Sequence, residues 1–324
     1  MQKTALVCGG HGFIGHHMAK KLKSEGYWVR TVDIEEYTYG NLDVDDYVIG
    51  DLTNKQVALD VTLCNGEPFD EVYQFAYWMG GAGVIFTGNY DAIVMHDSAL
   101  LDLNVIDACK INKAKKVYSA SSACVYPDYN QSDPNNPNCE ESSAYPASPD
   151  SDYGFTKLFG ERLCDAYRRN YGLNIKTCRF HNIFGIESTW EGGKEKAPAA
   201  VCRKVAECPD GGEIEIWGSG EQTRSFLYID ECIEAVRRYM NSDCNEVLNI
   251  GSEEMISINN LAKMAIEISG KNITIKNVDG PLGVMGRNSD NKLIKEKLGW
   301  EPNYPLRKGM EKTYAWVKEQ VDKR

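Results

Sequence analysis

The chain has 324 residues and a formal net charge of −11, from 36 Lys and Arg against 47 Asp and Glu. This length can form one large domain or two interlocked ones, and the acidic balance argues against nucleic acid or an anionic membrane surface as the main partner. No apolar run approaches the ~20 residues of a membrane span. The eleven cysteines are scattered, without Cys-x-x-Cys or zinc-ligand spacing, so we predict no metal site, free thiols and a cytoplasmic location.

The N-terminal segment has the pattern of a dinucleotide-binding unit. A buried strand (Lys3–Cys8) leads into a Gly-rich turn (Gly9–Gly15), an amphipathic helix (His16–Glu25) and a second strand (Trp28–Asp33). The glycines allow a tight turn, and a pyrophosphate can then bind at the helix N-terminus. An ordinary strand-turn-helix is the alternative. The residues predicted to contact the cofactor in this turn are Gly9, Gly12, Phe13, Ile14 and Gly15.

Acidic residues follow the next strands. Asp33 would accept hydrogen bonds from both hydroxyls of the adenosine ribose, and no Arg follows to bind a 2′-phosphate, so we predict NAD rather than NADP. The segment Tyr47–Leu52 predicts a short strand, with Asp51 and Leu52 at the adenine. Another strand, Glu71–Ala76, places Ala76 at the cofactor.

The alternation of strands and helices continues through the first half of the chain. The segment Met79–Gly83 predicts a flexible loop in which Gly80 and Gly81 let a ligand approach closely. A helix (Asp97–Asn112) and a strand (Lys116–Ala120) follow. Together these elements predict an α/β fold with a Rossmann-type, doubly wound parallel sheet. Ligands then bind beyond the C-terminal strand ends, where Ser122 and Cys124 lie.

Tyr153 and Lys157 lie four residues apart and face the same side of a helix. Ser151 or Asp152 would cap this helix after an irregular segment, Pro127–Asp152. An ammonium near the phenol favours the phenolate, so we expect a lowered Tyr153 pKa and a phenol that can accept a proton from a sugar or alcohol hydroxyl. The spacing alone also occurs by chance in many helices.

The second half of the chain is less regular. A strand (Ile175–Phe180) ends at His181 and Asn182, and the Rossmann alternation then breaks down after Gly185. We predict a Rossmann domain at residues 1–184, with segments near 225–252 returning to it, and a smaller C-terminal α/β substrate-binding domain at 185–324. The later predicted elements are a charged turn at 191–198, a helix to about Cys208, a strand at Glu213–Trp217, a helix from Asp230, a strand at Val247–Ile250, a helix from Ser257, a short helix after Ser289 and a final helix.

The Gly9–Gly15 turn, Ser122, Tyr153 and Lys157 together resemble the extended short-chain dehydrogenase/reductase family over the whole chain. Within that family, five further segments resemble the GDP-mannose 3,5-epimerases. They are Arg179–Ile183, Glu195–Ala200 with Cys202–Lys204, Gln222–Phe226, Gly286–Asp290 and Ile294–Trp300. The resemblance implies bound NAD, a GDP-sugar substrate and a homodimer. The residues that it implies for the substrate are Gly80, Gly81, Ser122, Asn182, Glu195, Lys196, Ala197, Lys204, Trp217, Gln222, Arg224 and Arg287.

The same resemblance suggests roles for Cys124 and Lys196. Without the resemblance, we would interpret Cys124 as a buried structural thiol and Lys196 as a solvated surface lysine. The resemblance makes Cys124 the candidate base and Lys196 the candidate acid. The chain departs from those epimerases at Ala76–Met79, where they carry Asp directly before Met-Gly-Gly, and at Lys194, where Arg is usual.

These features predict a nucleotide-sugar epimerase. Tyr153, assisted by Lys157 and Ser122, would remove the 4-hydroxyl proton during transient C4 oxidation, and Cys124 and Lys196 would exchange protons at C3 and C5. The alternatives are a 4-epimerase and a C4 dehydrogenase. An NAD-sensing binding protein is a further alternative, although a sensor has no need for an acid, a base and a hydride relay.

Overall fold

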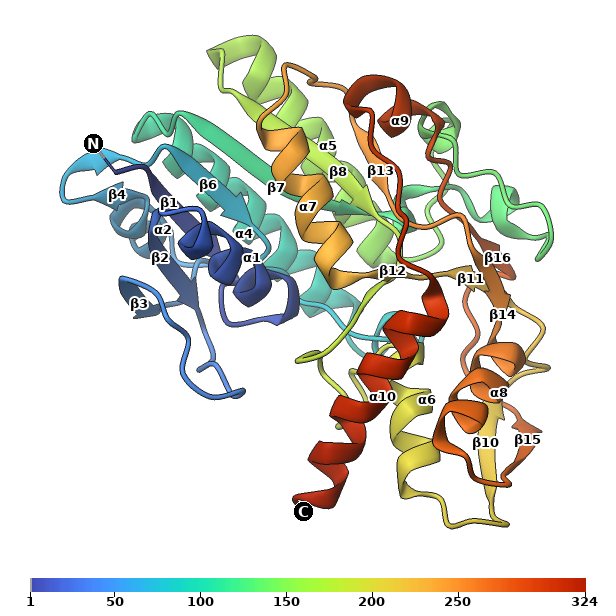
Figure 1. Ribbon diagram of the computed structural model, residues 1–324. Coiled ribbons are helices and arrows are strands. Elements are labelled where there is room, and N and C mark those ends of the chain that lie inside the picture. The colour runs from blue at the N-terminus through green and yellow to red at the C-terminus, as the bar shows by residue number, and fades with distance from the viewer. Residues whose placement is uncertain (1) are drawn as a thin grey trace.

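The computed structural model describes residues 2–324, and a seven-stranded parallel sheet is the largest element of that range (Figure 1). Strand β1 lies near its centre and pairs in parallel with β2 on one side and β6 on the other. In spatial order the strands are β13 (Leu248–Ile250), β8 (Ile175–Phe180), β7 (Lys116–Ser122), β6 (Glu71–Gln74), β1 (Thr4–Cys8), β2 (Trp28–Asp33) and β3 (Asp46–Ile49).

The strand order reverses between β1 and β6, because β2 and β3 extend to one side and the later strands extend to the other. In a doubly wound sheet, ligands bind outside the C-terminal strand ends at this switch point. The predicted Rossmann-type α/β fold is therefore confirmed, and the sheet itself indicates where the site lies.

Helices cover both faces of the sheet. On one face, α1 (Phe13–Ser24) packs against α7 (Ile229–Met240); on the other, α4 (Asp91–Ile111) packs between α2 (Lys55–Val61) and α5 (Asp152–Tyr171) (Figure 1). After β8 the chain leaves the sheet for the smaller part of the molecule and then returns through α7 and β13, so each part is built from segments that are not contiguous in the sequence.

The second half builds a smaller α/β layer beside the strand ends. Helix α6 packs against both α8 and α10, and two small sheets lie beside them (Figure 1). The elements are α6 (Ala197–Glu207), α8 (Ile258–Ser269), α10 (Leu306–Asp322), the pair β10 (Glu213–Trp217) and β15 (Thr274–Val278), and the sheet β14 (Met255–Ser257), β11 (Thr223–Ser225) and β16 (Gly286–Arg287). A further pair, β9 (Ile183–Phe184) and β12 (Leu227–Tyr228), lies next to α7, and α9 (Lys292–Leu298) packs against β13 of the large sheet (Figure 1). The remaining short elements are β4 (Leu63–Cys64), β5 (Glu67–Pro68), α3 (Ala82–Ile85) and the 3-10 turns η1 (Ala123–Val125), η2 (Asp128–Gln131) and η3 (Glu141–Ala144).

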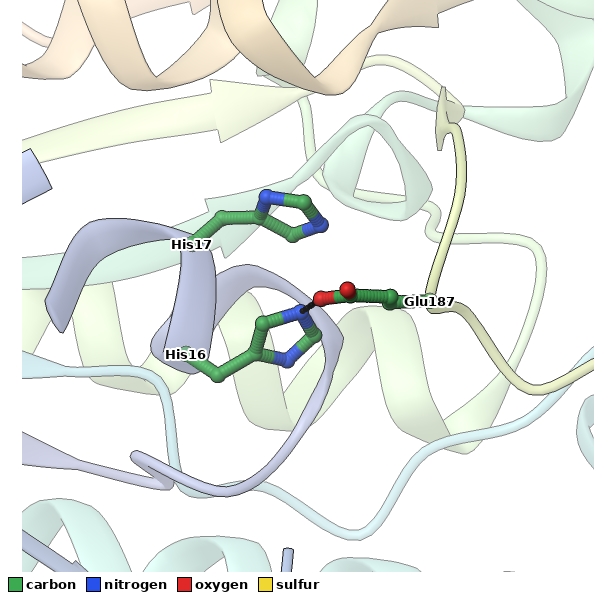
Figure 2. A group of neighbouring side chains, drawn as sticks. All are labelled: His16, His17 and Glu187. Carbon is green, nitrogen blue, oxygen red and sulfur yellow. Dashed lines mark ion pairs between the residues drawn. The ribbon is translucent and has the colours of Figure 1, made fainter. Parts of the chain in front are cut away.

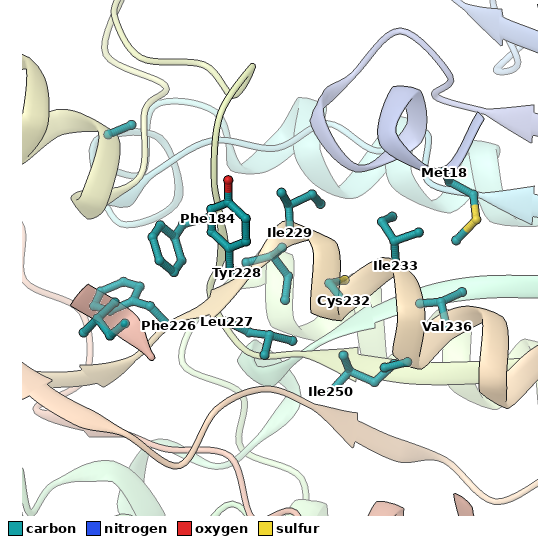
Figure 3. Packing of buried hydrophobic residues seen from close by; sticks show 14 of the residues in the cluster. Met18, Phe184, Phe226, Leu227, Tyr228, Ile229, Cys232, Ile233, Val236 and Ile250 are labelled. Atoms are coloured by element: carbon teal, nitrogen blue, oxygen red, sulfur yellow. The ribbon is translucent and has the colours of Figure 1, made fainter. Parts of the chain in front are cut away.

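One hydrophobic core joins the two parts of the molecule. It begins at Met18 on α1, continues through Ile233 on α7, and reaches Phe184 and Phe226 at the start of the smaller layer (Figure 3). These side chains are buried, and burying aliphatic and aromatic surface is the main stabilising contribution to such a core. The large sheet and the smaller layer, which face each other across the site, are therefore joined by one continuous core.

Several predicted boundaries differ from the structure. Helix α1 begins at Phe13 rather than His16, and α4 begins at Asp91 rather than Asp97. The first turn of α4 has no clear apolar stripe, so periodicity could not locate it. The predicted loop Met79–Gly83 runs into helix α3, with Gly81 as its N-cap.

None of the eleven cysteines forms a disulfide in residues 2–324, and ten of them are buried. Among residues 2–324, no helix has the length and apolarity needed to span a membrane.

Candidate active site

The Gly-rich turn shapes one end of a large cavity. A Cβ on Gly15 would lie 1.9 Å from the Gly9 carbonyl oxygen, and one on Gly9, which has φ +72°, would lie 2.6 Å from the Ala76 nitrogen. Gly12 caps α1 without a side-chain hydrogen bond. The first N–H groups of α1 therefore have no side-chain acceptor, as a helix N-terminus that binds pyrophosphate requires.

The strand ends next to this turn carry the two predicted acidic residues. Asp33 accepts a hydrogen bond from the His11 amide at 3.1 Å and one from the Ile34 amide at 2.8 Å. Asp51 accepts from the Thr53 amide at 2.8 Å. Each carboxylate is thus fixed by the backbone and retains acceptor capacity toward the cavity. These two acceptors fit the ribose hydroxyls and the adenine amino group of NAD.

Helix α5 carries Tyr153 and Lys157, and Ser151 caps it as predicted by accepting from the Gly154 amide at 3.3 Å. Gly154 lets α5 approach the η1 turn, since a Cβ there would lie 2.2 Å from the Cys124 carbonyl oxygen. The Tyr153 hydroxyl faces Met79 Sδ at 3.2 Å. The close contact between α5 and η1 brings Tyr153 and Cys124 into one small buried cluster.

The pKa of Tyr153 shifts in the direction opposite to the one expected from the sequence. Burial, followed by the nearby Cys124, raises the pKa of Tyr153 well above its usual value, although Ser122 opposes this. Burial also lowers the pKa of Lys157 to about 7. The Lys157 Nζ donates to the Ala120 carbonyl at 2.9 Å and lies 5.7 Å from the centre of the Tyr153 ring. Desolvation therefore outweighs the attraction that the four-residue spacing suggested.

Cys124 has a cationic neighbour that the sequence did not reveal. Arg287 Nη1 lies 3.1 Å from Cys124 Sγ, while its Nε donates to Gln131 Oε1 at 2.6 Å and its Nη2 to Asp150 Oδ2 at 2.5 Å. Burial lowers the pKa of Arg287, but Cys124 and Asp150 raise it more, so the guanidinium stays charged. A cation at this distance stabilises negative charge on the sulfur.

Three of the five N–H donors of Arg287 are used within the chain. Arg287 therefore contacts Cys124 and keeps two donors for the substrate contact that the resemblance implies. Its partners Gln131 and Asp150 were missed because they lie in the irregular segment at 127–152, which carries no recognisable motif.

The smaller layer contributes the opposite wall. Lys204 Nζ donates to the Glu215 carbonyl at 2.6 Å and lies over the Trp217 ring. Gln222 donates to the Trp217 carbonyl at 3.0 Å, which fixes the strand that presents the indole. Trp217 is 41% exposed, so its ring is available to stack on a planar group.

Two cations of this wall lack acidic partners. Arg224 donates to the carbonyl oxygens of Thr223 and Val284 at 2.8 and 2.7 Å, and within residues 2–324 no carboxylate lies within ion-pair distance of it. Burial, followed by Arg287, lowers the Arg224 pKa to about 10. Burial also lowers the pKa of Lys196, which the Cys124 sulfur opposes. Uncompensated cations facing a cavity indicate an anionic ligand.

Glu195, Gly80 and Gly81 line the cavity and also contact neighbouring segments of the chain. Glu195 pairs with Arg203 at 2.7 Å. A Cβ on Gly81 would lie 2.3 Å from the Glu195 carbonyl oxygen, and one on Gly80 would lie 2.6 Å from Val84. These two glycines were predicted to admit a ligand. In the structure they also allow segment 79–85 to pack against the charged turn.

One cavity of about 1010 Å³ lies between the sheet and the smaller layer. Every residue predicted for the catalytic, cofactor and substrate sites lines it, including Asn182 and Ala197. The cavity also contains Tyr77 and Trp78, which the sequence did not single out. Trp78 packs against Cys124 and Tyr153 at the position where the sequence departs from the epimerase pattern.

A separate polar cluster ties α1 to the segment after β9. His16, His17 and Glu187 bring potential metal-ligand atoms within 4.8 Å of one another (Figure 2). However, Lys20 donates at 2.6 Å to the same Glu187 oxygen that lies 3.0 Å from His16, and Tyr37 also donates to it. Because Lys20 already supplies the positive charge, we interpret this cluster as a structural contact beside the cavity.

Comparisons with known proteins agree with this geometry. A family model described as the NAD dependent epimerase/dehydratase family matches residues 5–251. GDP-mannose 3,5-epimerase of Arabidopsis thaliana is 44% identical over 319 residues, which cover 98% of this chain and 82% of that protein. UDP-glucose 4-epimerase of Thermotoga maritima, solved with UDP-glucose, gives a TM-score of 0.84 at 25% identity and covers 98% and 99% of the two chains. The UDP-glucose 4-epimerase of Thermus thermophilus, solved in complex with NAD, gives 0.83 at 21% identity, covering 97% and 99%.

Proposed function

Because the chain belongs to the NAD-dependent epimerase/dehydratase family, we propose that it is a nucleotide-sugar epimerase that acts on GDP-mannose or a close GDP-sugar and inverts C3 and C5. The observation that carries this proposal is the meeting of Cys124, Lys196 and Tyr153 in one cavity. Cys124 is close enough to both of the others to influence their pKa values. A C4-only enzyme has no need for this additional base and acid.

The chain's own residues have distinct tasks in this reaction. Gly9, Gly12, the α1 N-terminus and Asp33 would hold NAD, which supplies a hydride acceptor and donor when bound. Tyr153 accepts the proton of the 4-hydroxyl as the phenolate. Ser122 and Arg287 oppose the raised pKa of the phenol, and Lys157, whose Nζ lies 5.7 Å from the centre of the Tyr153 ring, would assist by adding positive charge beside it. The C4 ketone then makes the protons at C3 and C5 acidic.

Cys124 and Lys196 complete the inversion from two sides of the cavity. Cys124, at the end of β7, would remove a proton from one face of the sugar with Arg287 stabilising the thiolate. Lys196, at the N-cap of α6, would return a proton from the smaller layer. The lowered pKa of Lys196 makes its ammonium a better acid at neutral pH.

The nucleotide would lie against the smaller layer. Lys204 and Arg224 are placed to pair with the diphosphate, and Trp217 offers an exposed ring to the base. The support for this arrangement is the unpaired charge of Arg224 and the guanine nucleotide named for the 44% identical relative.

The test is incubation of the NAD-loaded enzyme with GDP-mannose and other GDP-sugars in deuterated water, followed by NMR and mass spectrometry. We expect deuterium at C3 and C5 in the wild type. Cys124→Ala and Lys196→Met should still form some keto-sugar but incorporate little or no label. If the wild type inverts C4 without label, it is a 4-epimerase; if it consumes NAD stoichiometrically, it is a dehydrogenase.

We extend the proposal to a homodimer formed through α4 and α5, which pack side by side. Their outer surfaces carry Ile93, Leu103, Phe155 and Phe159, each at least 40% exposed. An apolar surface of this kind favours burial against a second copy. Sedimentation should give a dimer mass for the wild type and a monomer mass for Phe155→Arg; a monomeric wild type would refute this.

The free cysteines support a reducing compartment, so we also propose a cytoplasmic location. Fractionation of the producing cells tests this directly, and recovery of the protein with secreted material would contradict it.

A further inference from the structure

Lys157 has an environment that a motif could not predict. Its side chain is 3% exposed, and its Nζ donates to one backbone carbonyl, that of Ala120. A buried ammonium needs more compensation than one neutral hydrogen bond provides. The additional group is Tyr77, because Lys157 Nζ lies over the face of its ring. The ring face carries partial negative charge and attracts a cation.

Tyr77 is in turn held by a buried carboxylate. Its hydroxyl donates to Asp102 Oδ1 at 2.6 Å and lies 3.2 Å from Ser119 Oγ. Asp102 is 1% exposed, and within residues 2–324 no cation lies within ion-pair distance of it. A carboxylate this deeply buried is costly unless nearby groups stabilise it. Its charge is therefore balanced through Tyr77 and, at longer range, by Lys157.

The helix that carries Lys157 is shaped to admit this carboxylate. A Cβ on Gly160 would lie 2.5 Å from Asp102 Oδ2. Gly160 is less than one turn from Lys157 on α5, while Asp102 lies on α4, which packs against α5. Glycine within a helix costs about 1 kcal/mol relative to Ala. Here it creates the space in which Asp102 lies close to the Lys157 side chain.

We propose that Asp102 and Tyr77 form a positioning pair for Lys157. Asp102 orients the Tyr77 phenol, and the ring face and the carboxylate together keep the Lys157 ammonium in place and charged. The inference rests on the proposed function in one respect, that Lys157 assists Tyr153 in proton transfer. It adds two residues that lie outside the motif and act through Lys157.

The titration behaviour of these groups agrees with the proposal. Burial lowers the pKa of Lys157 to about 7, and Asp102 is the strongest of the groups that oppose this. Burial raises the pKa of Asp102 to about 6, and Lys157 and Tyr77 oppose that shift. The other titratable groups that face Lys157 are Tyr153, Cys164 and Glu161 from α5 and Cys124 from η1.

An ionised Asp102 favours the charged form of Lys157, so removal of the Asp102 charge should lower the Lys157 pKa further. Above pH ~6, where wild-type Asp102 is ionised, the wild type and an Asn variant should therefore differ. At lower pH, protonation of Asp102 should make the wild type resemble the variant.

The test measures the Lys157 pKa directly by NMR of protein labelled with ¹³C at the lysine ε-carbons, with Lys157→Arg to assign the signal. Asp102→Asn should lower the Lys157 pKa by about one unit. Tyr77→Phe, which keeps the ring but frees the carboxylate, should lower it by less. Asp107→Asn is the matched control, because it changes an Asp on the same helix that pairs with Lys55 on the surface, and it should leave the Lys157 pKa unchanged.

An unchanged Lys157 pKa in folded Asp102→Asn protein overturns the proposal; if that variant does not fold, an unchanged pKa in Tyr77→Phe does so. A second measurement, the pH profile of GDP-sugar turnover, should show the fall in activity at high pH moved to lower pH in Asp102→Asn. The two failures can be told apart. A shifted Lys157 pKa without turnover of any GDP-sugar refutes the proposed function alone, whereas turnover with an unshifted pKa refutes the positioning pair alone.

Discussion

Replacement of Arg224 by Gln tests whether the cavity is built for an anionic nucleotide. The guanidinium lies in the cavity wall without a carboxylate partner, and its pKa of about 10 leaves it charged at neutral pH. A hydrogen bond between charged groups contributes roughly 2 kcal/mol. Loss of one such contact to the diphosphate should weaken GDP binding about thirtyfold, since 1.4 kcal/mol corresponds to about tenfold.

The weaker GDP binding of Arg224→Gln should also reduce the stabilisation of the folded protein by GDP. A ligand at 100 times its Kd stabilises the folded state by about 2.7 kcal/mol. At the same GDP concentration, a variant with thirtyfold weaker affinity should gain only about 0.9 kcal/mol. Denaturant unfolding with and without GDP measures this difference, and calorimetric titration gives the two affinities independently.

The matched control is Arg238→Gln, which removes an exposed arginine paired with Glu234 outside the cavity. It should leave GDP affinity and the GDP-dependent stabilisation unchanged. If Arg224→Gln binds GDP as tightly as the wild type, or if Arg238→Gln weakens binding equally, the assignment of Arg224 to the diphosphate is refuted.

Three further predictions concern the other parts of the site. Tyr153→Phe should lower turnover by ~10²–10⁴ while NAD affinity is retained, and steady-state kinetics with wild-type rates would remove Tyr153 from the mechanism. Asp33→Ser should reduce the preference for NAD over NADP in a cofactor titration, because the carboxylate repels a 2′-phosphate; an unchanged preference would contradict its role. Glu161→Gln should destabilise the fold by ~3–5 kcal/mol, because it breaks the buried pair with Arg179 (Nη2 to Oε2, 2.8 Å); an unchanged unfolding midpoint would show that the pair contributes little.

The sequence was sufficient for the parts of the protein that depend on local chemistry. Strand periodicity, the Gly9–Gly15 turn and the acidic end of β2 predicted the parallel sheet and the cofactor end of the cavity. Ser151 and Tyr153 could be placed on a helix because an N-cap and a four-residue spacing are properties of one segment. Motif matches also led to Lys196 and Arg224, although nothing local indicated that either would be partly buried in the cavity wall.

The tertiary structure decided the properties that depend on neighbours distant in sequence. Burial against the Cys124 turn raises the Tyr153 pKa and overrides the lowering that was expected from Lys157. Arg287 could be assigned to Cys124 only when β16 was placed beside the segment at 127–152. The contact of Asp102 with Tyr77 joins α4 to the end of β6. Local propensity and spacing act within a few residues, whereas desolvation and charge pairing act through space, so only the folded chain determines the electrostatics of the site.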